Sequence, residues 1–190
     1  MAQDKQLDGL KVAILALDGF EQAELLEPRK ALQAAGATAQ VVSAKAGQIQ
    51  GMQHDVKGEK VGVDLTLDQA DPSQFDAVLL PGGALNADTL RVNAKAKHFV
   101  QEMERAGKPF ALICHAPWLL VSAGLVKGRK LTSYHTVQDD IRNAGGEWTD
   151  QAVVKDRNWV SSRKPDDIPQ FNQAMVELFA QRVKEAHAAH

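Results

Sequence analysis

The residue best suited to chemistry in this chain is Cys114, its only cysteine. It directly follows the apolar segment 109–113 and precedes His115, Ala116 and Pro117. This pattern predicts a buried strand that turns abruptly into a helix, the geometry of a nucleophile elbow, which projects a side chain above a sheet. The start of a helix also favours thiolate over thiol. We therefore interpret Cys114 as a nucleophile, and not as a small buried core residue.

Two histidines are candidates for the surroundings of this sulfur. His115 is either a base or ion-pair partner of Cys114, or only a helix-start residue, because consecutive side chains of a helix diverge. His135 follows Tyr134 at the end of a predicted short strand, on the same edge of the sheet. Tyr134 and His135 are therefore candidates for the wall of a pocket.

A second candidate loop contains Gly82 and Gly83, which follow the apolar segment 75–80 and Pro81. Paired glycines let a backbone approach a ligand closely and turn its N–H groups toward that ligand. With the N–H of His115, the N–H of Gly83 could form an oxyanion hole. The alternative is an ordinary tight turn, and the Gly-Lys-Ser/Thr ending of a phosphate-binding loop is missing.

A third loop contains two carboxyl groups, Glu21 and Glu24, just past the first apolar run. At a helix start, residues three apart face one side. A carboxyl buried against a thiol is shifted toward its protonated form and can donate a hydrogen bond to a thiolate. The alternative role is an acid that favours the N-terminus of a helix.

Apolar runs and helix-like spacings alternate along the chain. Strands are predicted at residues 11–17, 40–43, 61–65, 75–80, 109–113, 131–133, 153–154 and 159–160. Helices are predicted at residues 21–35, 94–106, 116–123, 137–144 and 168–189. Strands that alternate with helices indicate a parallel sheet, so we expect one α/β sandwich domain over residues 1–190. Ligands of such sheets bind beyond the carboxyl ends of the strands, where the three loops lie.

Three local features have more than one interpretation or depart from this rhythm. Pro28 marks either a helix that starts near Glu27 or a kink, because proline cannot donate to the preceding turn. Residues 47–58 form a hairpin or a loop with short strands. The charged residues 57–60 are interpreted as a solvated turn.

Composition and the lack of certain motifs exclude several classes of function. The formal charge is −2, from 22 basic and 24 acidic residues, which argues against nucleic-acid binding by bulk charge. The sequence has neither a signal-peptide pattern nor a membrane-spanning run, and its single cysteine suits a reducing compartment, so we expect a cytoplasmic protein without a membrane partner. Metal motifs such as HExxH and CxxC, and a GxGxxG after the first strand, are missing, so we expect no metal and no cofactor.

Taken together, these residues resemble the PfpI (intracellular protease I) branch of the ThiJ/PfpI superfamily. The similarity covers nearly the whole chain, at residues 18–24, 63–64, 75–83, 114–117, 122–125, 128–129, 140–145, 158–163 and 165. It implies a flavodoxin-like three-layer sandwich with a mostly parallel central sheet, assembled as a homodimer or a higher homo-oligomer. It also implies that Cys114 is the nucleophile, His115 its partner and Glu24 the acid bonded to the sulfur, with Glu21 nearby.

In this branch a third acid can come from the neighbouring subunit, and Asp88 is the nearest match here. The chain departs from the branch at two places. Ala116 stands where the branch has glycine, and residues 84–89 are one residue longer, so that either Asp88 or Asn86 could reach the partner site.

The resemblance and the residues together predict a stress-related, cysteine-dependent enzyme that acts on reactive carbonyls or on early glycation adducts of damaged proteins. One alternative is an intracellular cysteine peptidase completed in an oligomer. Another is a non-enzymatic sensor of oxidative stress, or a chaperone, that uses oxidation of Cys114.

Overall fold

The computed structural model describes residues 5–189 and is built around a seven-stranded sheet. The strand order is β11-β12-β8-β7-β1-β3-β6, and every pairing is parallel except β11 with β12. In the order of the sheet, the strands are β11 (Val154–Asp156), β12 (Trp159–Ser162), β8 (Phe110–Ile113), β7 (Ala77–Leu80), β1 (Lys11–Leu15), β3 (Thr38–Ser43) and β6 (Leu65–Thr66). The predicted mostly parallel α/β sandwich is confirmed.

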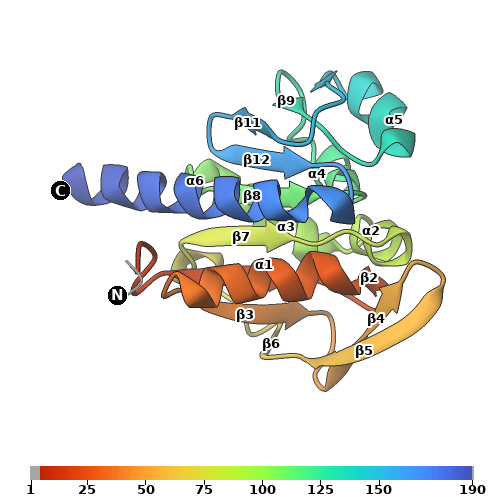
Figure 1. The fold of residues 1–190 in the computed structure, drawn as a ribbon, viewed down its shortest axis with the longest axis horizontal. Coiled ribbons are helices and arrows are strands. Elements are labelled where there is room, and N and C mark those ends of the chain that lie inside the picture. The colour runs from red at the N-terminus through yellow and green to blue at the C-terminus, as the bar shows by residue number, and fades with distance from the viewer. Residues whose placement is uncertain (1–4, 190) are drawn as a thin grey trace.

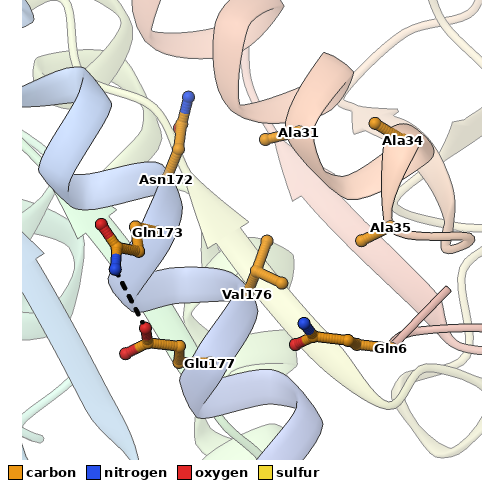
Figure 2. Close-up of a pocket in the computed structure, with 8 residues that line it drawn as sticks. All are labelled: Gln6, Ala31, Ala34, Ala35, Asn172, Gln173, Val176 and Glu177. Carbon is orange, nitrogen blue, oxygen red and sulfur yellow. Dashed lines mark hydrogen bonds between the residues drawn. The ribbon is translucent and has the colours of Figure 1, made fainter. Parts of the chain in front are cut away.

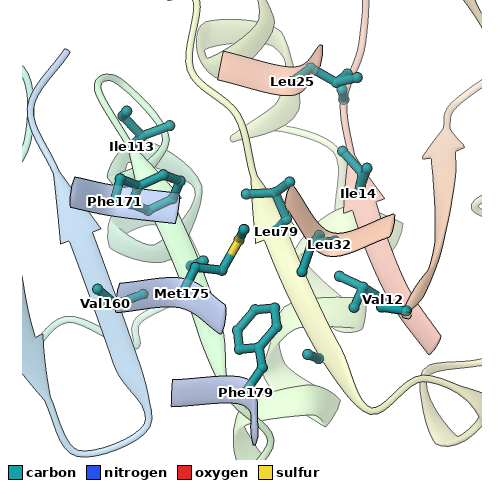
Figure 3. Close-up of a cluster of buried hydrophobic side chains, with 14 of the residues drawn as sticks. Val12, Ile14, Leu25, Leu32, Leu79, Ile113, Val160, Phe171, Met175 and Phe179 are labelled. Carbon is teal, nitrogen blue, oxygen red and sulfur yellow. The ribbon is translucent and has the colours of Figure 1, made fainter. Parts of the chain in front are cut away.

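Helices cover both faces of this sheet (Figure 1). One face packs against α1 (Gln22–Ala34) and α6 (Ile168–Ala188), and the other against α3 (Ala94–Arg105), α4 (Pro117–Ser122) and α5 (Gln138–Asn143). Successive side chains of β1 point to opposite faces of the sheet, so the strand contributes to the apolar clusters on both faces. Val12 and Ile14 enter one cluster, and Ala13 and Leu15 enter the other. Figure 3 shows the first cluster, in which side chains of α1 and α6 meet those of the strands.

Several short elements lie outside this sandwich. A three-stranded sheet contains β2 (Phe20–Glu21), β4 (Gln48–Gln53) and β5 (Val56–Gly62), and a two-stranded sheet contains β9 (Lys130–Leu131) and β10 (Glu147–Trp148). The remaining elements are the helix α2 (Ala84–Leu90) and three 3₁₀ turns, η1 (Pro72–Gln74), η2 (His135–Val137) and η3 (Pro165–Asp167). Within residues 5–189, no helix combines the length and the apolarity that crossing a membrane requires.

Four sequence-based expectations need correction. Helix α1 begins at Gln22 and includes Pro28, which agrees with the predicted helix 21–35, so of the two interpretations of Pro28 the start near Glu27 is wrong. Leu25, Pro28 and Leu32 are buried, and this packing outweighs a cost of about 3 kcal/mol for proline inside a helix. Residues 47–58 belong to a hairpin, but residues 57–60 are part of its strand β5 and not a turn.

The other two corrections concern strand limits and the loop after β7. The predicted strand 61–65 is divided between β5, which pairs with β4, and β6, which pairs with β3. The candidate loop with Gly82 and Gly83 leads directly into helix α2, which begins immediately after Gly83 and which the sequence did not predict. Both differences come from pairing and packing with distant segments, which hydrophobic periodicity alone does not report.

A buried ionic cluster connects α3 to the strand pair β11–β12. The Arg129 side chain is 4% exposed, and its guanidinium binds Glu104 at 3.0 Å and Asp156 at 3.1 Å. It also donates to Asn158 Oδ1 at 2.9 Å and lies 3.8 Å from the ring centroid of Trp159. Trp159 Nε1 donates to the other oxygen of Glu104 at 2.8 Å, so this carboxylate is the shared acceptor of the cluster.

We predict that Glu104→Ala lowers the free energy of unfolding by about 3–5 kcal/mol, because it leaves the Arg129 charge buried without its main partner. Urea denaturation followed by circular dichroism measures this change. Glu102→Ala on the same helix is the control, since its partner Arg105 is exposed, and it should cost less than about 0.5 kcal/mol. Equal costs for the two variants would contradict the account.

Candidate active site

Cys114 lies at the carboxyl end of β8, at the junction with α4. Its φ angle is 65°, a left-handed conformation that is rare for a residue with a side chain. Hydrogen bonds on both sides maintain this turn: the Cys114 N–H donates to the Ser162 carbonyl at 3.0 Å, and the Cys114 carbonyl accepts from the Tyr134 N–H at 2.9 Å. This is the strained strand-to-helix turn expected of a nucleophile elbow.

Glu24 reaches the cysteine from the first turn of α1. The residue is fully buried, and its Oε1 accepts from the Gly82 N–H at 3.0 Å. The Glu24 carboxyl also lies close enough to Cys114 for each group to shift the pKa of the other. A Cβ atom added to Gly82 would lie 2.7 Å from the Cβ of Cys114 and would clash with Glu24 Oε1. Only glycine fits between these two side chains.

Burial sets the protonation of this pair. Burial, reinforced by the charge of Glu21, raises the pKa of Glu24 to about 8, against the lowering effect of its hydrogen bonds with Cys114 and Gly82. At pH 7 the Glu24 carboxyl is therefore mostly protonated, as predicted, and it can donate to the sulfur.

Burial also raises the pKa of the Cys114 thiol, and the charge of Glu24 adds to this effect whenever that group is ionised. The main-chain N–H groups of His115 and Gly83 oppose it, because both hydrogen-bond to the sulfur. The sequence-based expectation that the helix start favours the thiolate is thus opposed by burial, and α4 has only six residues. The thiol needs a base beside it.

His115 occupies the position of that base. Its Nδ1 lies 3.1 Å from Cys114 Sγ, so the direct contact that the sequence left open is present. The imidazole stacks on Tyr134 with ring centroids 4.8 Å apart, and Trp118 meets it edge-on at 5.2 Å. Burial lowers the pKa of His115, with a smaller contribution from His135, so the ring is neutral at pH 7 and able to accept a proton.

Trp118 was missed in the sequence analysis. It lies three residues after His115, across the turn into α4, and a separation of three residues at a helix start could have indicated the contact. Its Nε1 donates to Asp140 Oδ2 at 2.9 Å, and the Arg91 guanidinium lies 5.3 Å from its ring centroid. These two contacts fix the indole ring of Trp118, which packs edge-on against the imidazole of His115 and restricts its orientation.

A cavity of about 370 Å³ opens above the sulfur. It is lined by Glu21, Glu24, His54, Gly83, Ala84, Cys114, His115, Tyr134, Lys164, Pro165 and Asp166. Sequence analysis missed His54, Lys164 and Asp166, although Pro165 belongs to a segment that carries the resemblance. His135 does not line this cavity but an adjoining one of about 260 Å³, which shares Tyr134 and Lys164 with it.

A larger cavity, of about 440 Å³, lies between α1 and α6 (Figure 2). Its walls contain alanines, amides, Val176 and Glu177, and Glu177 accepts a hydrogen bond from Gln173 at 3.2 Å. It has no nucleophile and no histidine. The chemistry therefore belongs to the smaller cavity, and size alone does not identify the site.

The structure separates the two candidates on α2. Asn86 is fully buried: its Oδ1 accepts from the Leu17 N–H at 2.7 Å and its Nδ2 donates to the Gly82 carbonyl at 3.0 Å. Asn86 therefore positions the turn before α2 and cannot reach a neighbouring subunit. Asp88 is exposed and does not line the cavity of its own chain.

No group of three or more His, Cys, Asp or Glu residues placed to hold a metal ion occurs within residues 5–189. Carboxylate, imidazole and thiol groups meet around Cys114, but their hydrogen bonds to one another suit proton transfer. The arrangement can move a proton from sulfur to imidazole and stabilise an oxyanion with two main-chain N–H groups.

Comparisons with known proteins agree with this geometry. The model of the DJ-1/PfpI family matches residues 10–178. Deglycase TK1284 of Thermococcus kodakarensis is 46% identical over 169 residues, which are 89% of this chain and 99% of the relative, and Deglycase PfpI of Pyrococcus furiosus is 43% identical over the same shares. The crystal structure of Drosophila melanogaster DJ-1beta superposes with a TM-score of 0.82 at 26% identity, covering 95% of this chain and 96% of that one.

The first prediction from this site concerns Gly82. Gly82→Ala should lower the free energy of unfolding by about 1–3 kcal/mol and displace Glu24 from Cys114, because the new methyl group has no room. Thermal and urea denaturation measure the change. Gly62→Ala in β5 is the matched control, since a Cβ there meets nothing within 4 Å, and it should be neutral or slightly stabilising. A Gly82→Ala variant as stable as the control would contradict the packing.

The second prediction concerns the proton on Glu24. Its native pKa of about 8 exceeds the ordinary value of 4.5, so the native state holds a proton that the unfolded state loses between these pH values. Wild type should therefore lose stability relative to Glu24→Gln as pH rises through this window, by about 1 kcal/mol per pH unit. Urea titrations at pH 5, 6.5 and 8 measure the difference. Glu27→Gln, at an exposed carboxyl of the same helix, is the control, and its free energy of unfolding should differ from that of wild type by the same amount at each pH. If the difference for Glu24→Gln were also independent of pH, the Glu24 carboxyl would not be protonated in the native state.

Proposed function

The chain belongs to the DJ-1/PfpI family, and we propose that it is a deglycase that protects against reactive carbonyls. Its substrates are early adducts of a dicarbonyl such as methylglyoxal with amino or guanidino groups of proteins, and also the free dicarbonyl. The observation that carries the proposal is the contact of 3.1 Å between Cys114 Sγ and His115 Nδ1 in a cavity wide enough for a side-chain adduct. The deglycase names of two relatives support it.

In the first step Cys114 displaces the substrate nitrogen. The substrate carbon bears a hydroxyl and the nitrogen, and is bonded to a ketone. As Sγ forms its bond to this carbon, the thiol proton passes to His115 Nδ1 and then to the nitrogen, and the carbon–nitrogen bond breaks. The products of this step are the free amine and a hemithioacetal on Cys114. The protonated Glu24 carboxyl donates to the sulfur while negative charge develops there.

Water completes the reaction. His115 takes the proton from the carbon attached to sulfur, while the hydroxyl proton on that carbon passes to the ketone oxygen to give an enediolate. His115 then returns its proton to the former ketone carbon, which gives a hydroxyacyl thioester. Water then attacks the thioester carbonyl, and the N–H groups of Gly83 and His115 stabilise the oxyanion. The carbon–sulfur bond breaks, and Cys114 recovers its proton. Adduct and water thus give the free amine and a hydroxy acid, with no other reactant.

We propose that turnover does not depend on a peptidase-type triad within one chain. No hydrogen bond connects His115 to a carboxylate among residues 5–189, and Asp88 lies outside the cavity. A homodimer that covers α2 could bring Asp88 to a neighbouring site, and Leu85, which is 64% exposed on that helix, supports such a contact. We also propose a cytoplasmic location, which suits a single free thiol.

The test is consumption of methylglyoxal and of its adduct with N-acetylarginine by purified protein, with lactate measured as the product. Cys114→Ser should lower both rates at least 100-fold because it removes the nucleophile, while its circular dichroism spectrum stays that of wild type. His135→Ala is the control and should keep most of the activity, since His135 does not line the cavity.

Unchanged rates in Cys114→Ser would remove the enzymatic proposal. If wild-type protein releases no lactate, and one equivalent of peroxide instead converts Cys114 to its sulfinic acid, the function is that of an oxidation sensor. Mass spectrometry of the intact protein measures this oxidation of Cys114.

A further inference from the structure

A second carboxylate in the cavity, that of Glu21, is not used by the mechanism above. Glu21 ends β2 and is half-buried, and its side chain lines the cavity together with Cys114. Its hydrogen-bond partner is the main-chain N–H of His54, at 3.3 and 3.2 Å from the two oxygens. Within residues 5–189 Glu21 takes part in no ion pair, unlike Asp166, another of the three carboxyl groups on the cavity wall.

The remaining charges of the cavity do not neutralise Glu21. Lys164 is paired with Asp166, with Nζ and Oδ2 3.7 Å apart. Glu24 is protonated below pH 8, and the imidazole of His115 is neutral. The negative charge of Glu21 therefore faces the cavity uncompensated, beside the sulfur that must attack the substrate.

The position of this carboxylate is fixed before any ligand arrives. Glu21 precedes the first residue of α1, and its main-chain N–H donates to the Gly82 carbonyl at 3.2 Å. The turn between β4 and β5 holds the side chain through His54, whose φ angle of 58° directs its N–H to the carboxylate. One shared N–H leaves most of the acceptor sites of the two oxygens unused, because a carboxylate offers about four.

We propose that Glu21 binds the guanidinium group of a glycated arginine side chain and thereby selects adducts of arginine over free dicarbonyl and over neutral adducts. The proposal rests on the deglycase function and adds its substrate class. A guanidinium presents parallel N–H donors that match the two oxygens of a carboxylate. The cavity of about 370 Å³ is also much larger than a three-carbon dicarbonyl needs, and it falls within the range of sites that hold larger ligands.

The first measurement is binding to the Cys114→Ser variant by isothermal titration calorimetry, which needs no turnover. N-acetylarginine amide is compared with N-acetylcitrulline amide, which has nearly the same shape but no charge. We expect the arginine derivative to bind at least tenfold more tightly. The added substitution Glu21→Gln should abolish this difference, whereas Asp166→Asn, on the rim and already paired with Lys164, should preserve it.

The second measurement compares turnover of two methylglyoxal adducts, those of N-acetylarginine amide and of N-acetylcysteine amide. Glu21→Gln should raise the KM for the arginine adduct about tenfold and leave the KM for the neutral cysteine adduct within twofold. Loss of the Glu21 charge also changes Glu24, but that effect applies to both substrates and cancels in the ratio.

Equal binding of the arginine and citrulline derivatives would overturn the proposal, as would an equal effect of Glu21→Gln on both adducts. This comparison of ligands uses unchanged Glu21, so it stands even if Glu21→Gln does not fold. Selective binding without lactate release would refute the deglycase function and support the cation site. Lactate release without a preference for the arginine derivative would support the deglycase function and refute the cation site.

Discussion

The contact between the buried carboxyl of Glu24 and the sulfur of Cys114 is the constraint on which the rest of the site depends. Neither side chain has room to move, because Gly82 fills the space beside both and donates its N–H to Glu24. A carboxylate without solvent is costly, so the group keeps its proton at neutral pH and becomes a donor. The same burial makes the thiol a weak acid, and that is why the base at 3.1 Å, His115, is needed.

Three chain segments must meet for this contact to form, and hydrogen bonds to main-chain groups join them. The loop after β1 is tied to the loop after β7 through Asn86, which binds the Leu17 N–H and the Gly82 carbonyl. The elbow after β8 is tied to the end of β12 by the bond from the Cys114 N–H to Ser162. These bonds connect rigid strands of one parallel sheet, so the reacting groups are held without a metal or a disulfide in the described residues.

The groups next to the sulfur differ in charge from those elsewhere on the cavity wall. Near the sulfur, the acid and the base are both neutral at pH 7, which suits transfer of one proton between close partners. On another wall of the cavity, the turn between β4 and β5 holds the carboxylate of Glu21, and Lys164 and Asp166 form an ion pair at the rim. Chemistry and recognition are therefore assigned to different elements of the fold.

The sequence by itself determined the α/β class, the order of most strands and helices, and the elbow at Cys114, because these follow from local periodicity, glycine and proline positions, and motif spacing. It limited the acid to Glu21 or Glu24, and the family resemblance chose Glu24. Only the tertiary structure decided that His115 contacts the sulfur, that Asn86 is a buried positioning residue, and that His54, Lys164 and Asp166 share the cavity. It also reversed the expected direction of the thiol pKa and revealed α2 in a predicted loop. The physical reason is that burial and contacts between distant segments set these properties, and both arise only when the loops after β1, β7 and β8 pack together.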